Sequence, residues 1–366
     1  PTVEKIISEN LNQPVHIGNL SGQILPSPRL EVGELYIGKG KQLQAAKVQL
    51  NFSFTGVLGE NKFIDSIEIE NFAVIGSSIQ EVSEWLQELA ASKQYPTSHI
   101  RLSQGTLDAD AFKVTGVEGD LNFSATQKFT SANLRANTGK YTLDLKAGQG
   151  SKLQVAISVK SSALPLLPNW VFDEITAKGE LDQNQLVISE YEGNILGGTI
   201  KGDSRVTWRT SWQAQGKIIA KNITMNHFND LLDGDIDGDA YFKMNSLKLG
   251  GLTDSSRLDG SFTANKGTLK GVDIVETARL RSKDHLPGGR THFDKMSGSV
   301  SFVNNIYQFD KVRIKTNVLN STASIEVEKD QLSGDMEANL KIQDKTTTTN
   351  LEIGGTLDRP QLHTSQ

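Results

Sequence analysis

The sequence predicts a mainly β protein built of antiparallel strands, with a few short helices. Apolar and polar residues alternate one by one along several runs, among them residues 46–54, 141–147, 153–159 and 336–342. Successive side chains of a strand point to opposite faces, so each run has one apolar and one solvated face, as in an antiparallel sheet. Turn residues recur about every ten positions, which predicts on the order of fifteen strands.

One run near the N-terminus breaks the alternation. Leu30 and Val32 are in phase with each other, whereas Leu35 and Ile37 are one residue out of step, and Gly33 lies at the slip. A β-bulge at Gly33 would absorb the extra residue. Strands do not alternate with long helices, which argues against a doubly wound nucleotide-binding fold.

The clearest helix is predicted at residues 79–91. Trp85 and three other apolar residues recur there at helical spacing, and Ser78 and Glu81 form a capping box in which each side chain can bind a backbone N–H of the other residue. The apolar stripe is only wide enough for a core contact, so we expect this helix to be a cap or end plug.

Three shorter helices are also predicted. They lie at residues 3–11, at residues 224–232 and from Asp273, where Glu276 completes a second capping box. The first two carry apolar residues at helical spacing. Helices are therefore expected only at the start of the chain and between strands.

Composition and charge exclude several classes of function. The 366 residues carry 38 basic and 43 acidic side chains, a formal net charge of −5, and no basic tract, so we expect no nucleic acid as a partner. The absence of cysteine excludes disulfides, thiolate metal sites and cysteine nucleophiles. No apolar stretch approaches the roughly 18 residues of a membrane span. Because the chain begins at Pro1 rather than Met, we expect a trimmed or processed product, and a preceding segment could have been an anchor or a signal.

Residues 33–40 nearly fit the phosphate-binding loop pattern. Gly40 stands where Ser or Thr would bind magnesium, and the alternating run 46–54 follows where the pattern requires a helix. We interpret the segment as a β-turn.

Residues 233–238 resemble the first half of a calcium-binding loop, with Asp233, Asp235 and Asp237 at alternate positions. Met244 occupies the twelfth position, where such a loop requires a bidentate carboxylate. We interpret the segment as a solvated acidic turn and expect neither a metal nor another cofactor.

No motif for catalysis is recognisable. None of the six histidines forms the helical pair of a zinc hydrolase, and there is no Gly-x-Ser-x-Gly elbow. Acidic pairs such as Glu68 and Glu70 are expected of a solvated strand face. We therefore expect no enzyme and no catalytic residues.

Several segments together resemble the AsmA-like family of bacterial envelope proteins. They follow the family's order along nearly the whole chain: residues 11–18 (LNQPVHIG), 26–32 (PSPRLEV), 202–208 (GDSRVTW), 270–274 (KGVDI), 288–293 (GGRTHF), 297–300 (SGSV) and 354–362 (GGTLDRPQL). Two positions depart from the family pattern, because Asn12-Gln13 replaces Gly-Arg and Asn304-Asn305 replaces Asn-Gly.

The resemblance implies an elongated, curved, taco-like antiparallel sheet with an apolar groove. It further implies a periplasmic body anchored to the inner membrane through a segment before Pro1, related to bridge-like lipid carriers. The implied function is phospholipid binding and transport with a role in outer-membrane homeostasis, and other envelope proteins are possible partners. The family has no catalytic residues to carry over.

The resemblance also implies two parts of the chain. Residues 1–95 would form the AsmA-like start, with a juxtamembrane helix and the capping helix 79–91. Residues 96–366 would form the elongated β-sheet body, including the AsmA-like C-terminal segment.

Candidate groove residues are apolar members of the alternating runs. They are Val48, Leu50, Phe52, Leu143, Leu145, Val155 and Ile157. Period two does not distinguish a groove from an ordinary core, so a closed β core in a non-enzymatic envelope scaffold or assembly-complex subunit stays an alternative. A carbohydrate-active β enzyme is a third possibility, with no acid and base to support it.

Overall fold

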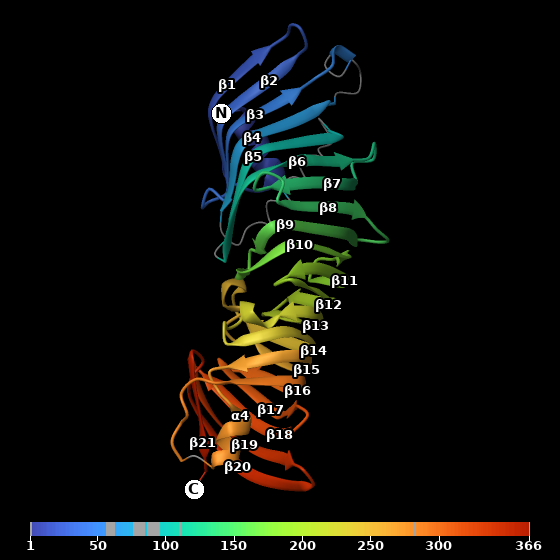
Figure 1. Cartoon of the computed structure of the whole chain (residues 1–366). Coiled ribbons are helices and arrows are strands. Elements are labelled where there is room, and N and C mark those ends of the chain that lie inside the picture. The colour runs from blue at the N-terminus through green and yellow to red at the C-terminus, as the bar shows by residue number, and fades with distance from the viewer. Residues whose placement is uncertain are drawn as a thin grey trace. The chain divides into compact units, whose positions relative to one another are not determined.

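The computed structural model describes residues 2–55, 63–75, 85, 96–109, 111–281 and 283–365. Its described part contains 21 strands and two short α-helices, which confirms the predicted mainly β, largely antiparallel fold. The chain divides into two compact units, residues 1–183 and 184–366, each containing a curved sheet (Figure 1). The partition at residues 95 and 96 stays a prediction.

The first unit begins with one helix and continues with ten strands. Its elements are α1 (Thr2–Leu11), β1 (Val15–Gln23), β2 (Arg29–Ile37), β3 (Leu43–Asn51), β4 (Ser66–Ile75), β5 (His99–Ala109), β6 (Phe112–Phe123), β7 (Phe129–Ala136), β8 (Tyr141–Ala147), β9 (Leu153–Leu164) and β10 (Leu167–Leu181). Each strand pairs with the next one along the chain, so the order of the strands in the sheet follows their order in the sequence. Helix α1 confirms the helix predicted at residues 3–11.

The second unit contains eleven strands, one α-helix and two short 3-10 helices. Its elements are β11 (Gln185–Ile195), β12 (Gly198–Trp208), β13 (Trp212–Thr224), η2 (Met225–His227), β14 (Leu232–Ser246), η3 (Leu249–Gly251), β15 (Arg257–Lys270), α4 (Ile274–Leu280), β16 (Arg290–Val303), β17 (Ile306–Lys315), β18 (Leu319–Glu328), β19 (Gln331–Ile342), β20 (Lys345–Thr356) and β21 (Arg359–Thr364). Every described strand pair in this unit is antiparallel.

One strand pair departs from the antiparallel pattern. Strands β4 and β5 run parallel, with Ile67 opposite Ile100. A parallel pair requires a crossover connection, because a tight hairpin can join only antiparallel strands. The helix predicted at residues 79–91 falls in this connection, but only Trp85 of that segment lies within the described residues. Trp85 is helical and 7% exposed.

The slip predicted at Gly33 is real, but it leaves the pairing register unchanged. Glu34, not Gly33, takes the left-handed backbone conformation, with φ of +53°. Asn71 in β4 and Gln104 in β5 do the same at the matching level, with φ of +50° and +54°. Because neighbouring strands insert their extra residue in the same row, β1, β2, β3 and β4 keep one continuous register.

Two predicted helices end differently from expectation. The helix expected at residues 224–232 is reduced to the single turn η2, because β14 already begins at Leu232. At α4 the Asp273 side chain accepts a hydrogen bond from the backbone N–H of Glu276 at 2.9 Å, as predicted. The Glu276 carboxylate instead accepts two bonds from Arg279, at 2.6 and 2.9 Å, so only half of the capping box forms.

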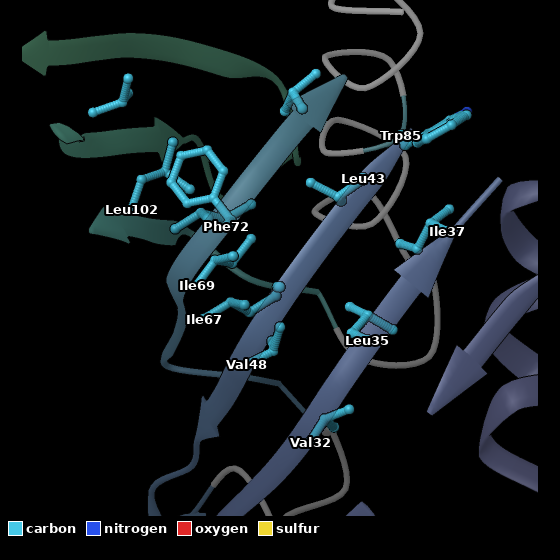
Figure 2. Packing of buried hydrophobic residues seen from close by; sticks show 14 of the residues in the cluster. Val32, Leu35, Ile37, Leu43, Val48, Ile67, Ile69, Phe72, Trp85 and Leu102 are labelled. Carbon is cyan, nitrogen blue, oxygen red and sulfur yellow. The ribbon is translucent and has the colours of Figure 1, made fainter. Parts of the chain in front are cut away.

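Each unit has its own apolar core on one face of its sheet. The first core takes its members mainly from β2 to β6, together with Leu11 of α1 and Trp85 (Figure 2). The second core lies between strands β15 to β21 and helix α4, which contributes Ile274 and Ala278. Side chains on the opposite sheet faces are mainly polar, as the alternation predicted.

Replacement of Ile100 by Ala tests the first core. Ile100 is fully buried and lies opposite Ile67 in the parallel pair. We expect I100A to lower the free energy of unfolding by about 2–5 kcal/mol, because it leaves a cavity in a packed sheet face. Chemical denaturation measures this loss. The control R101A removes an exposed side chain of the next residue and should cost less than about 1 kcal/mol. Equal losses for the two variants would contradict this description of the core.

Candidate functional site

Two rows of mainly apolar residues, each with a single glycine, cross the sheet of the first unit from β2 to β10. Residues directly opposite each other on paired strands lie on the same face, so each row can be followed from strand to strand. The first row is Leu30, Leu50, Ile67, Ile100, Leu121, Ala132, Leu145, Val155 and Gly179. The second row is Val32, Val48, Ile69, Leu102, Gly119, Leu134, Leu143, Ile157 and Ala177. We call these two rows the apolar lane.

The structure brings six of the seven predicted groove residues together in this lane. Val48 and Leu50 lie on β3, and the other four are two directly opposed pairs, Leu143 with Ile157 and Leu145 with Val155. Phe52 lies two residues beyond Leu50, after the end of β3, and packs against the first core.

Sequence reasoning missed the members of the lane on β4 to β7. The alternation of Ile67 and Ile69 with Glu68 and Glu70 was a usable signal for β4. On β6 and β7 the lane contains Gly119 and Ala132, which weaken the apolar pattern. Cross-strand pairing, which the sequence does not display, is what joins these residues to the predicted ones.

The lane is covered at one end and more open at the other. On β3 to β5 it is part of the first core, and Val48, Ile67 and Ile100 are at most 6% exposed. Figure 2 shows Val32, Val48 and Ile69 on one face of neighbouring strands, with Trp85 in the same cluster. On β8 and β9, by contrast, Leu143, Leu145 and Ile157 are only half-buried and belong to neither core.

The reverse face of the same strands is polar. Lys47 Nζ lies 3.6 Å from a Glu31 carboxylate oxygen and 3.4 Å from one of Glu70. On the next level, the Asn51 amide donates hydrogen bonds to Ser66 and Glu68 at 3.0 and 3.1 Å. Exposed pairs of this kind add little stability, about 0–1 kcal/mol each, but they keep this face solvated. The sheet of the first unit is therefore two-sided, with the lane on its apolar side.

The second unit also has an apolar row, but glycines interrupt it. The row runs through Gly202, Ile218, Ala240, Gly260, Val300, Phe309, Ile325, Gly334, Ile353 and Leu362. A glycine offers no side chain to a ligand, so this row presents less apolar surface than the lane does. The lane is thus the better candidate site.

The nucleotide-like segment is partly strand and partly turn, since only residues 38–40 form the predicted turn, and the metal-like segment lies in a strand. Gly33 to Ile37 belong to β2, and β3 rather than a helix follows, so residues 33–40 do not form a phosphate-binding loop. Residues 233–238 lie within β14, which corrects their interpretation as a turn. Among the described residues there is no group of three or more acidic or histidine side chains that could hold a metal ion.

The aspartates of β14 are engaged by neighbouring groups. Asp237 accepts a hydrogen bond from the Asn222 backbone N–H at 2.8 Å and one from Lys221 Nζ at 3.0 Å. Asp235 accepts one from the Thr224 hydroxyl at 3.2 Å. Asn222 has φ of +53° at a break in the β13–β14 register, which frees its N–H from the strand ladder. The Asn222 N–H, with Lys221 as the second cause, lowers the pKa of Asp237 below its ordinary value of 3.8.

A depression of about 460 Å³ lies in the second unit beside these aspartates. Its walls carry charged and polar side chains, including Lys217, Lys221, Asp237 and Asp239, together with Ile219 and Phe262. This lining does not suit acyl chains. In the described part of the chain no helix is long and apolar enough to cross a membrane.

Replacement of Asp237 by Asn tests the bond to the irregular Asn222 backbone. A carboxylate whose pKa is lowered by folding stabilises the fold above its ordinary pKa, and this contribution is lost as the pH falls through the lowered value. We expect D237N to be less stable than the parent chain at pH 7 by about 0.5–1 kcal/mol, since the group is partly solvated. Urea denaturation should show the difference shrinking below about pH 4. A constant difference from pH 7 to strong acid would contradict the assignment.

Comparison of this chain with the models of known protein families, with curated proteins and with solved structures finds no match. Support for a family therefore comes from the ordered sequence segments alone. Of these, 354–362 covers the hairpin between β20 and β21, and 297–300 lies inside β16.

Proposed function

We propose that this chain is a non-enzymatic lipid-binding domain that holds acyl chains along the apolar lane. The observation that carries the proposal is the continuity of two apolar rows across nine strands, with Leu143, Leu145 and Ile157 of β8 and β9 only half-buried. A continuous apolar strip without convergent polar groups suits a ligand that is itself long, apolar and chemically uniform.

The dimensions of the lane suit an acyl chain. The rows lie two residues apart along the strands, or ~7 Å, and successive strands are ~4.8 Å apart. Each methylene removed from water contributes about 0.8 kcal/mol. Shelter along a few strands would therefore offset most of the cost of withdrawing a lipid tail from a membrane, without any specific contact.

The biological setting follows from the sequence resemblance. The AsmA-like segments favour a periplasmic domain tethered to the inner membrane before Pro1 and acting in phospholipid transport and outer-membrane homeostasis. Other envelope proteins are the expected protein partners.

One observation favours a different function, that of an envelope scaffold with a closed core. Val155 and Val159, which lie on the more open part of the sheet, are only 5% and 2% exposed. If that part packs dry, the lane is an ordinary core and the protein is a structural subunit of an envelope assembly. The experiment below separates the two functions.

Lipid occupancy of the purified protein tests the proposal. Native mass spectrometry should detect co-purifying phospholipid on the parent chain. We expect I157D to lose it, because a carboxylate in the half-buried lane opposes an acyl chain. The matched control S158D places the same charge on the next residue, which faces the polar side, and should keep the lipid. A parent chain free of lipid would favour the scaffold.

A second measurement guards against misfolding of I157D. The chain has no cysteine, so I157C and S158C each introduce a single labelling site. An environment-sensitive dye at position 157 should shift to the blue when phospholipid is added, whereas the dye at position 158 should not. Equal responses at the two positions would contradict a one-sided lane.

A further inference from the structure

Large apolar side chains are exposed in two loops of the first unit. Ile24 and Leu25, between β1 and β2, are 72% and 76% exposed. Phe54 and Phe63, between β3 and β4, are 45% and 38% exposed. Water-exposed apolar clusters are unfavourable unless another surface covers them.

Strand pairing places these two loops at the same end of the sheet. Gln23 is opposite Arg29, which in turn is opposite Asn51. The loops are joined directly, since the Phe52 backbone N–H donates a hydrogen bond to the Pro28 carbonyl at 2.9 Å. In Figure 1 the first of these loops joins β1 to β2. We call Ile24, Leu25, Phe54 and Phe63 the apolar tip.

The backbone of the tip is suited to an apolar medium. Pro26 and Pro28 have no N–H, so the first loop carries two fewer donors that would need water. The Pro28 carbonyl already accepts the Phe52 bond. Arg29, which directly follows the first loop, donates a hydrogen bond to Gln23. In the first loop, few unpaired polar groups would therefore have to be dehydrated on insertion.

The tip follows the apolar lane along the chain. Val48 and Leu50 of β3 belong to the lane, Phe52 after the end of β3 packs against the first core, and Phe54 is two residues further on. The described residues of the two loops, 24–28, 52–55 and 63–64, carry no charged side chain, and such a surface matches a lipid bilayer better than a protein partner, whose interface usually includes a polar rim.

We propose that the apolar tip inserts into the surface of a phospholipid bilayer. The choice of a bilayer as the occupant rests on the proposed lipid-binding function, although insertion itself requires no lipid in the lane. Insertion is driven by apolar burial, so it does not depend on anionic headgroups.

Flotation of the full chain with phosphatidylcholine vesicles tests the proposal. The parent chain should float with the vesicles at both low and high salt, because neutral lipid leaves little charge attraction to screen. The double variant I24D/L25D should bind at least about tenfold more weakly, and both sites are too exposed for the change to unfold the protein. The control L247D alters a leucine of the second unit that is 85% exposed, and should float like the parent chain. Failure of the parent chain to float, or equal weakening by L247D, would overturn the proposal.

A depth measurement gives an independent test. The variants L25C and L247C, each with one fluorescent label, are mixed with phosphatidylcholine vesicles that contain a spin-labelled lipid quencher. Quenching at position 25 but not at position 247 supports insertion of the tip. Equal quenching at the two positions, or none at either, overturns it.

The vesicle-binding and lipid-occupancy experiments together distinguish failure of the tip proposal from failure of the lane proposal. If I24D/L25D loses vesicle binding but still co-purifies with phospholipid, both proposals stand. If the parent chain floats but carries no lipid and gains none, the tip stands and the lane does not. If lipid co-purifies but the parent chain does not float, the lane stands and the tip is overturned.

Discussion

The fold depends on strict register between neighbouring strands. A shift of one residue in a single strand would turn its side chains to the other face, so a lane across nine strands requires that neighbouring strands stay aligned. In the first unit, neighbouring strands carry their irregular residue at the same level, and the pairing register is kept. Glu34, Asn71 and Gln104 all adopt positive φ at one level, so the apolar faces of β2, β4 and β5 change phase together. Leu35 and Val32 are consequently buried on the same face although they are three residues apart.

This matched register produces two different environments on one face. At β3 to β5 the face is covered by Leu11 and Trp85, and it behaves as a core. At β8 and β9 the same rows belong to neither core, and their larger side chains stay half-buried. The proposed binding region is therefore the uncovered continuation of the core, and the same hydrophobic force that holds the first strands together would hold a lipid tail further along.

The strands and their two faces were predictable from the sequence, because the alternation of apolar and polar residues is visible within each short run of consecutive residues. Val48 and Leu143 show the same alternation, yet Val48 is 6% exposed and Leu143 is half-buried. The difference arises from what lies over them, and Trp85 and Leu11 are distant in the sequence. The slip after Val32 was also predictable, but its compensation in β4 was not, because it depends on which strands pair. The aspartates of β14 were predicted to lie in a solvated acidic turn, whereas they lie within a strand.

The parallel pair of β4 and β5 determines which connections lie at each end of the strands. Up to β4 the chain reverses direction at every strand, so the connections after β1 and β3 lie at the same end of the strands. Because β5 runs in the direction of β4, the connections at that end are afterwards those that follow the even-numbered strands β6 and β8. Those later connections, residues 124–128 and 148–152, are hydrophilic and include Lys128 and Lys152. The exposed apolar loops at this end of the strands therefore belong to the first four strands, and the later connections at the same end are hydrophilic.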